Sequence, residues 1–371
     1  MKNKISVATP VFLGNEKKYL MDCLESGWIS SLGSYIDKFE ETFAKYIGTK
    51  YAVAVSNGTV AIHLLLKALN ISEGDEVIIP DLTFIATANS VSYTGATPVF
   101  VDSECNSWNI SPDNIIKKIT KKTKAVICVH LYGQPCDMKN IMRICRQNKI
   151  YLIEDCAEAH GAEFLNKKVG SFGIGGTYSF YGNKIITTGE GGMIVTNNKR
   201  LFFELRHLRD HAMSKTKRYY HTEIGYNYRM TNLQAAIGLA QLENIQKILD
   251  KKRHIENEYN KYLCNIKEIE LQNTFADRKK VCWLYSVLIK SNNQKNRDNL
   301  MKYLETKGVD TRPFFIPMTQ LPPYKSNNKN SNALLLSNQG LNLPTSYNLT
   351  DNEIEYICQN IKLFFSNKRI K

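Results

Sequence analysis

A chain of 371 residues is longer than most single domains, so a large domain with a smaller companion is expected. Its 43% hydrophobic and 23% charged residues exclude extended disorder and a fibrous architecture. The formal net charge of +14 raises the hypothesis of nucleic-acid binding. The lysines, however, fall within amphipathic stretches such as 117–124 and 247–253, which are typical of solvated helix faces. This distribution of lysines predicts no nucleic-acid partner, while a basic surface favours an anionic small substrate.

The N-terminus has no long apolar core, and no later segment approaches the roughly 18 uninterrupted apolar residues of a membrane span. This predicts a cytoplasmic protein without a membrane partner. Nine cysteines are scattered without a Cys-x-x-Cys pair, so they are expected to be reduced, structural thiols, and no metal site is predicted.

Between residues 50 and 200, short apolar runs alternate with helical patterns. Nearly unbroken hydrophobicity in the runs is typical of strands covered on both faces. This alternation predicts an α/β fold with a doubly wound, mostly parallel central sheet in a large domain. The expected strands are 51–55, 75–80, 97–102, 124–130, 151–155, 176–180 and 191–196, and the expected helices are 59–68, 84–93, one opening at Ser111, and 138–148.

The pattern changes after residue 230. One long helix is expected there, capped by Thr231 and carrying apolar residues from Ile237 to Leu249. We therefore place a domain boundary near residue 240. It separates a large cofactor-binding domain, 1–240, from a small α+β domain, 241–371.

The C-terminal region contains one strand-like run, 282–289, and a helical pattern at 297–307. A final helix is predicted to open at the capping box formed by Thr350 and Glu353. The polar stretch 325–332 is expected to be a surface loop.

Ligands of doubly wound folds gather at the carboxyl ends of the strands, and a lysine follows one of these ends. Lys184 lies in SFYGNKIITTGEGG, among small, aromatic and polar residues. An amine forms a Schiff base only when it is unprotonated, which burial or cationic neighbours favour. A lysine that merely extends to solvent from a strand end is the alternative, and this segment alone favours that alternative.

Two other strand ends carry residues that could bind a cofactor together with such a lysine. Asp155 ends the run YLIED, and an anionic partner is what the pyridinium nitrogen of pyridoxal 5'-phosphate (PLP) requires, although a helix-capping aspartate is the alternative. In SNGTVAIHLLL, Gly58 permits close backbone approach and Thr59 opens a helix whose N-terminus can bind a phosphate. Many loops between strands and helices look like this one, so the motif is weak when taken alone.

Together, five segments resemble the DegT/DnrJ/EryC1/StrS family of sugar aminotransferases, which are fold-type I PLP enzymes, over nearly the whole chain. They are VSNGTVAIHL, VICVHLYGQPCDM, IEDCAEA, FYGNKIITTGEGGM and GYNYRMTNLQAAIGLAQLE. The resemblance implies that Lys184 forms a Schiff base with PLP and carries the proton during amino transfer. Relatives with histidine at this position are sugar dehydratases, so Lys184 favours transamination.

The resemblance also implies the other cofactor contacts. Asp155 would lie at the pyridine nitrogen, Phe84 would stack on the ring, and Glu158 would lie near the ring hydroxyl. The cofactor phosphate would be held by Gly58, Thr59 and Ser179.

A further implied contact is Asn227, which would reach the phosphate from a neighbouring subunit, so a homodimer or larger homo-oligomer is expected. Arg229, Arg312 and Tyr324 are candidates for contacting the sugar nucleotide. Close relatives commonly carry histidine where this chain has Thr319, in a segment expected to face that substrate. This departure leaves the sugar and the base open.

The reaction implied is transfer of an amino group from L-glutamate to C4 of a nucleotide-linked 4-keto-6-deoxyhexose. The favoured substrate is GDP-4-keto-6-deoxy-D-mannose, giving GDP-perosamine. The same chemistry on a UDP- or dTDP-linked 4-keto-6-deoxy-D-glucose is the first alternative. A regulatory protein built on the PLP-enzyme fold is a remote one.

Overall fold

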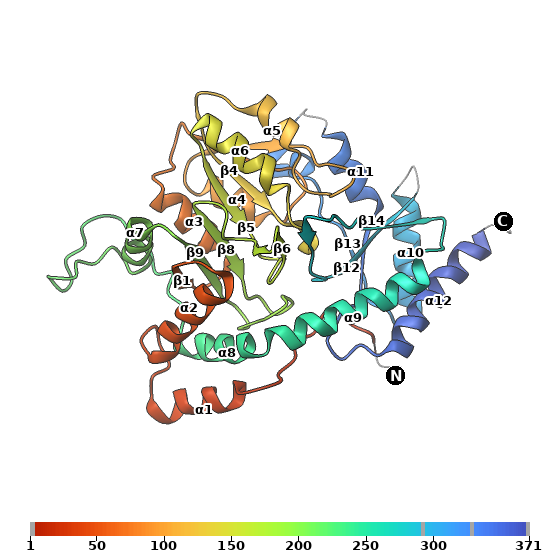
Figure 1. Ribbon diagram of the computed structural model, residues 1–371, viewed down its shortest axis with the longest axis horizontal. Coiled ribbons are helices and arrows are strands. Elements are labelled where there is room, and N and C mark those ends of the chain that lie inside the picture. Colours follow the sequence, from red (N-terminus) through yellow and green to blue (C-terminus); the bar gives the residue numbers. More distant parts are fainter. Residues whose placement is uncertain (1–3, 291–293, 327–329, 369–371) are drawn as a thin grey trace.

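A central sheet organises the computed structural model, which describes residues 4–290, 294–326 and 330–368. Within these residues the sheet has the strand order β1-β9-β8-β5-β4-β2-β3 (Figure 1). Neighbouring strands are parallel except at β9, which runs antiparallel to β1 and β8. The predicted α/β fold is thus confirmed. The strands are β1 (Tyr51–Val55), β2 (Glu76–Pro80), β3 (Thr97–Val101), β4 (Thr123–Val129), β5 (Tyr151–Asp155), β8 (Gly175–Ser179) and β9 (Gly192–Thr196).

Helices cover both faces of this sheet because consecutive strand residues point to opposite sides. Val77 and Ile79 pack into a core shared with α3, α4 and α7, whereas Ile78 packs into a core shared with α5 and α6. A third core lies beneath α2 and α8. These helices are α2 (Ser34–Ile47), α3 (Gly58–Ala68), α4 (Ala86–Ser92), α5 (Pro112–Lys118), α6 (Met138–Asn148), α7 (Lys199–Arg209) and α8 (Asn232–Glu243), and α1 (Glu16–Ser26) packs on α8.

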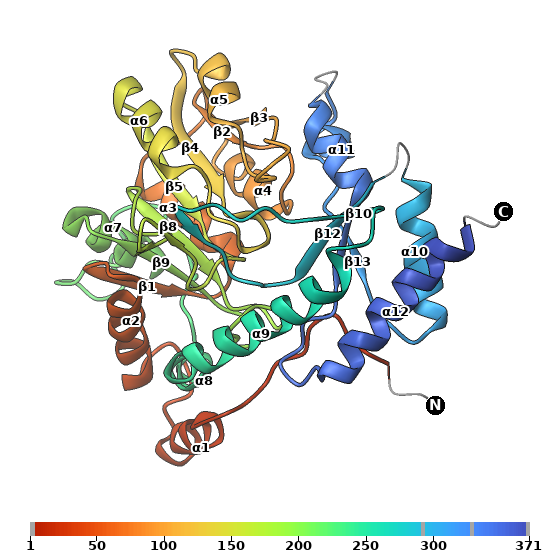
Figure 2. The ribbon, with the colours of Figure 1, turned by 45° about the vertical axis from the view of Figure 1, so that its right-hand side comes forward.

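The single long helix expected after Thr231 is wrong: the chain forms α8 and then α9 (Ile245–Leu263), separated at Asn244. Asn244 has φ −111° and ψ 9°, and its side-chain amide donates to the Ala240 carbonyl at 3.3 Å. Asparagine favours such local backbone bonds over helix continuation. Thr231 does cap α8, with Gln234 completing a capping box. From the break, α9 extends toward the C-terminal helices (Figure 2).

A second sheet lies in the C-terminal region, with the order β10-β12-β14-β13. The sequence predicted only one of these strands, β12 (Tyr285–Ile289). The other three are too short to show a strand pattern: β10 (Ile269–Leu271), β13 (Arg312–Pro313) and β14 (Gly340–Leu343). The predicted helices appear as α10 (Lys295–Thr306) and α12 (Asp351–Lys368). Thr350 and Glu353 form the predicted capping box, with the Thr350 N–H donating to the Glu353 carboxylate at 2.9 Å and the Glu353 N–H donating to the Thr350 hydroxyl at 3.3 Å.

The C-terminal region has a core of its own, from Ile255 on α9 to Phe365 on α12. The domain boundary near residue 240 stays a prediction, and α9 begins within the core of the large sheet, through Ile245 and Ile248. A small third sheet pairs β6 (Glu163–Phe164) with β7 (Lys167–Lys168) and β11 (Arg278–Lys279).

The polar stretch predicted as a surface loop is described only in part, since 327–329 lie outside the described residues. Its last two residues, Ser331 and Asn332, instead begin α11 (Ser331–Gln339). Single turns of 3-10 helix occur at Leu131–Gly133, Met318–Gln320 and Pro322–Tyr324. Within the described ranges, none of the helices combines the length and the apolar character needed to cross a membrane.

Candidate active site

A cavity of about 600 Å³ lies at the carboxyl ends of the sheet strands. It brings together seven residues that are far apart in the sequence and that the sequence predicted as cofactor ligands. They are Gly58, Thr59, Phe84, Asp155, Glu158, Ser179 and Lys184. Two further lining residues, Trp283 and Phe315, come from the C-terminal region. The cavity therefore lies where the large sheet meets the C-terminal part of the chain.

One end of the cavity is formed by the start of α3 and the end of β8. Asn57 caps α3 by accepting the Val60 N–H at 3.0 Å, and the first turn of a helix carries amide groups without intrahelical acceptors. A Cβ added at Gly58 would lie 2.8 Å from the Ser179 Cβ. Only glycine therefore allows this close approach, and the resulting site suits a phosphate.

Asp155, at the end of β5, lines the cavity and is only 6% exposed. It accepts the Thr87 hydroxyl at 2.9 Å and the Ala157 N–H at 3.2 Å. Burial raises its pKa, while these two hydrogen bonds oppose the shift. A cationic ligand beside it would favour the ionised form. Sequence reasoning missed Thr87, which lies three residues after Phe84 and seven after the end of β2.

Lys184 and Glu158 share the same cavity. Burial lowers the pKa of the Lys184 amine, and the nearby Glu158 and Asp155 carboxylates oppose that shift. Burial likewise raises the pKa of Glu158 to about 7, while its carboxylate accepts the Tyr132 N–H at 2.7 Å. A lysine with a lowered pKa beside two carboxyl groups is suited to Schiff-base formation and to proton transfer.

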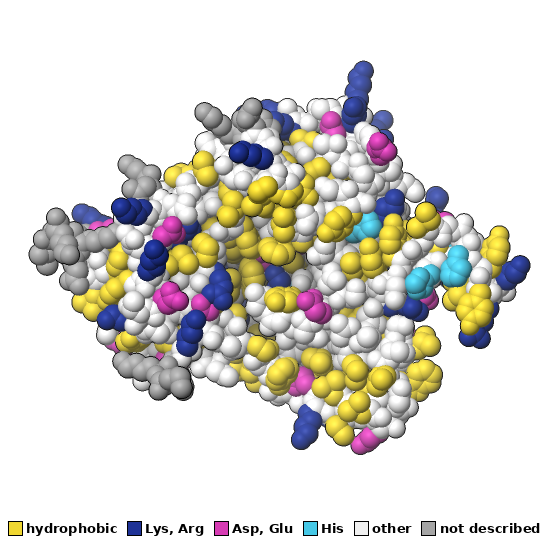
Figure 3. Space-filling view, turned by 180° about the vertical axis from the view of Figure 1, so that it is seen from behind, with side chains coloured by type: hydrophobic (Ala, Val, Ile, Leu, Met, Phe, Trp, Pro, Cys, Tyr) yellow, Lys and Arg dark blue, Asp and Glu magenta, His cyan; other side chains and the backbone are white. Residues whose placement is uncertain are grey.

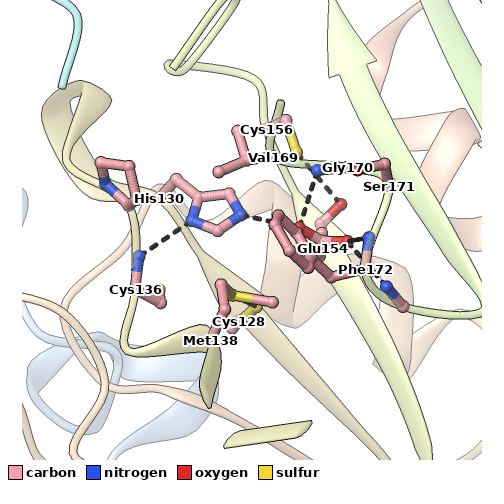
Figure 4. A network of polar contacts seen from close by, with 12 residues as sticks. Cys128, His130, Cys136, Met138, Glu154, Cys156, Val169, Gly170, Ser171 and Phe172 are labelled. Carbon is pink, nitrogen blue, oxygen red and sulfur yellow. Dashed lines mark hydrogen bonds and ion pairs between the residues drawn. The ribbon is translucent and has the colours of Figure 1, made fainter. Parts of the chain in front are cut away.

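Glu154, next to Asp155 on β5, has a different role (Figure 4). Its carboxylate accepts backbone N–H groups of the turn 170–173 at 2.7 to 2.8 Å and lies 3.3 Å from His130 Nε2. The other ring nitrogen of His130 accepts the Cys136 N–H at 3.1 Å. This buried network fixes the turns on either side of β5, which in turn holds Asp155 in place.

An aromatic wall closes the side of the cavity that faces the C-terminal region. Phe84 is 55% exposed, and its ring centroid lies 5.7 Å from that of Phe315. Tyr132 stacks on Phe315 at 5.5 Å and on Trp283 at 6.2 Å. Sequence reasoning missed Trp283, because an apolar residue in the strand-like run 282–289 looks like ordinary core. It also missed Phe315, although the segment of Thr319 was expected to face the substrate.

The remaining predicted site residues lie outside the cavity lining of their own chain. Asn227 is exposed and accepts from the Arg229 guanidinium at 3.2 Å, and Arg229 pairs with Asp210 at 2.8 Å. Arg312 pairs with Asp310 beside a separate hollow on the C-terminal region.

Tyr324 and Thr319 both bind parts of the large sheet domain. The Tyr324 hydroxyl donates to Asn89 at 2.7 Å. Thr319 is buried, and its N–H and hydroxyl both donate to the Asp81 carboxylate at 2.8 Å. Within this segment it is Phe315, and not Thr319, that lines the cavity.

The model of the DegT/DnrJ/EryC1/StrS aminotransferase family matches residues 13–362 of this sequence. The chain belongs to this family. The GDP-perosamine synthases of Escherichia coli O157:H7 and Vibrio cholerae are 46% and 45% identical to it, each over 98% of this chain and 99% of their own sequence. Among solved structures, the X-ray structure of an aminotransferase from Psychrobacter cryohalolentis is similar with a TM-score of 0.91 and 33% identity, covering 97% of this chain and 98% of the other.

The chain is thus a PLP-dependent aminotransferase, as the sequence predicted. The cavity fits the cofactor on independent grounds. The close approach of Gly58 to Ser179 leaves room for a phosphate at a helix N-terminus, and Asp155 offers a buried carboxylate to a ring cation. Lys184 lies in the same cavity with a lowered pKa.

Proposed function

We propose that the protein transfers an amino group from L-glutamate to C4 of GDP-4-keto-6-deoxy-D-mannose, giving GDP-perosamine. The observation that carries this proposal is the cavity in which Lys184 meets Asp155 and Glu158, in a chain that is 46% identical over nearly its whole length to a GDP-perosamine synthase. Retention of the lysine favours amino transfer over the dehydration expected of relatives that carry histidine there.

Bound PLP supplies an electron sink, which makes the hydrogen at the amine-bearing carbon acidic. Lys184 would hold the cofactor through its Nζ, and the free Nζ would take a proton from one carbon and return it to another. Asp155 would pair with the ring nitrogen and favour its protonated form. Gly58, Thr59 and Ser179 would bind the phosphate, and Phe84 would restrict the position of the ring.

The test is amination of three 4-keto sugars, linked to GDP, UDP and dTDP, by the purified protein with PLP and L-glutamate. The products are identified by mass spectrometry. Amination of the GDP sugar in preference to the others supports the proposal. Preference for a UDP- or dTDP-linked sugar retains the amino transfer and contradicts the substrate, whereas amination of none contradicts the function.

Two variants complete that experiment. Lys184→Ala is expected to abolish product formation and the borohydride-reducible bond to PLP. Lys167→Ala is the matched control, since Lys167 is an exposed lysine of β7 outside the cavity. Equal activity of the two variants would contradict the role proposed for Lys184.

We further propose that the active unit is a homodimer in which Asn227 reaches the cavity of the partner. Exposed apolar side chains support a covered surface, because large apolar patches are uncommon on monomers. They gather over α1 and on the loop that follows α7 (Figure 3). The most exposed of them are Phe12, Leu24, Trp28, Leu32, Tyr219 and Ile224.

Mixed dimers test this arrangement. Lys184→Ala and Asn227→Ala chains are each expected to be impaired alone, and their co-expression is expected to restore activity, because one site of each mixed dimer then has both residues intact. A chain that is monomeric by light scattering, or mixed dimers without restored activity, would contradict the shared site.

A further inference from the structure

Trp283 is a cavity residue to which neither the sequence motifs nor the proposed reaction gives a role. It lies between β11 and β12 in the C-terminal region, is 4% exposed, and lines the cavity of Lys184. The Lys184 Nζ lies 4.0 Å from the centroid of its ring. This is a close cation–π distance, and the attraction is strongest for tryptophan in a site shielded from water.

The indole ring is held firmly in this place. Its Nε1–H donates to the backbone carbonyl of Asn183, the residue before the lysine, at 2.8 Å. Its ring stacks on Tyr132 with an interplanar angle of 13°. The Trp283 carbonyl accepts from the buried Lys252 ammonium at 3.1 Å and from the Thr345 hydroxyl at 2.9 Å. These three hydrogen bonds and the stacking contact fix the position of the ring relative to the lysine.

In the part of the chain that the structure describes, no ion pair of 4.0 Å or less joins the Lys184 ammonium to a carboxylate. His160, nearby, stays neutral, because burial lowers its pKa to about 3. The other titratable groups that line the cavity are Asp155, Glu158, Glu190, Tyr93, Tyr178 and Tyr181.

We propose that the indole face of Trp283 receives the Lys184 ammonium whenever the lysine is not bound to the cofactor, which makes Trp283 a positioning residue for proton transfer. The inference rests on the proposed function, in which Lys184 takes a proton from one carbon and gives it to another. Between these steps the proton is on Nζ, and the ammonium needs a partner that stabilises its charge without raising its pKa strongly. A π face meets that need, whereas a carboxylate paired with the ammonium would raise its pKa further and retain the proton.

The experiment replaces Trp283 site-specifically with tryptophans that carry one, two or three ring fluorines. Fluorine weakens the negative potential of the ring face and leaves the shape and the Nε1–H nearly unchanged, so folding is preserved. The same series at Trp108, a fully buried tryptophan that does not line the cavity, is the matched control. The pKa of Lys184 is measured in the protein without PLP, from the pH dependence of its competitive labelling by acetic anhydride.

The pKa of Lys184 is expected to fall with each fluorine at position 283, by about one unit over the series, and to stay constant in the Trp108 series. In the PLP-loaded enzyme, the pH profile of a single turnover with L-glutamate should move in the same direction.

An unchanged pKa across the Trp283 series, or an equal fall in both series, would overturn the inference. The labelling needs neither cofactor nor sugar. A graded pKa shift in an enzyme that aminates no sugar would therefore contradict the proposed function and leave the role of Trp283 standing.

Discussion

Replacing Gly58 with alanine is expected to weaken the binding of PLP through its phosphate. The added Cβ would lie 2.8 Å from the Ser179 Cβ and 3.3 Å from the Ser179 Cα, below the 3.4 Å at which ordinary contact begins. Both atoms belong to or adjoin the backbone of β8, so the start of α3 and the end of β8 must separate. Overpacking of this kind costs about 1 to 3 kcal/mol. Because the phosphate requires the close arrangement of α3 and β8, this cost falls on binding and raises the dissociation constant about 5- to 150-fold.

The assay is a titration of the cofactor-free protein with PLP, and with pyridoxal, which lacks the phosphate. Gly58→Ala should weaken PLP binding by the stated factor and leave pyridoxal binding nearly unchanged. Gly182→Ala is the matched control, because a Cβ there meets no atom within 4 Å and the backbone needs no left-handed conformation. An unchanged PLP affinity, or equal losses for PLP and pyridoxal, would refute the reasoning.

Three other predictions concern buried carboxylates. The pKa of Glu158 is raised from 4.5 to about 7 by burial, so the folded cofactor-free protein binds this proton more tightly than the unfolded chain. This stabilisation, up to roughly 3 kcal/mol, is present below about pH 4.5 and is lost as the pH rises through about 7. The free energy of unfolding of Glu158→Gln, measured in urea, should lack this pH dependence. Thr319→Val removes a 2.8 Å hydrogen bond to the buried Asp81 and should lower the free energy of unfolding by about 1.5 to 3 kcal/mol, whereas Thr319→Ser should not. Glu154→Gln places an amide NH₂ among backbone N–H donors of the turn 170–173 and should cost about 3 kcal/mol or more in the same assay; a variant as stable as the wild type would contradict the network drawn in Figure 4.

The sequence alone determined the layout of the large domain. Strands buried on both faces must be apolar throughout, and their runs coincide with the observed β1 to β5, β8 and β9. The strand ends also pointed to Lys184, Asp155 and Gly58, because the carboxyl ends of parallel strands converge on one crevice. Motif order then indicated the family, which the comparisons confirmed.

Tertiary structure decided what local pattern could not encode. The short strands β10, β13 and β14 and the antiparallel direction of β9 depend on neighbours distant in the sequence. The same holds for the wall of the cavity. Trp283 and Phe315 belong to a region whose apolar residues resemble any core, and only the packing of that region against the large sheet brings an indole ring within 4.0 Å of the Lys184 amine.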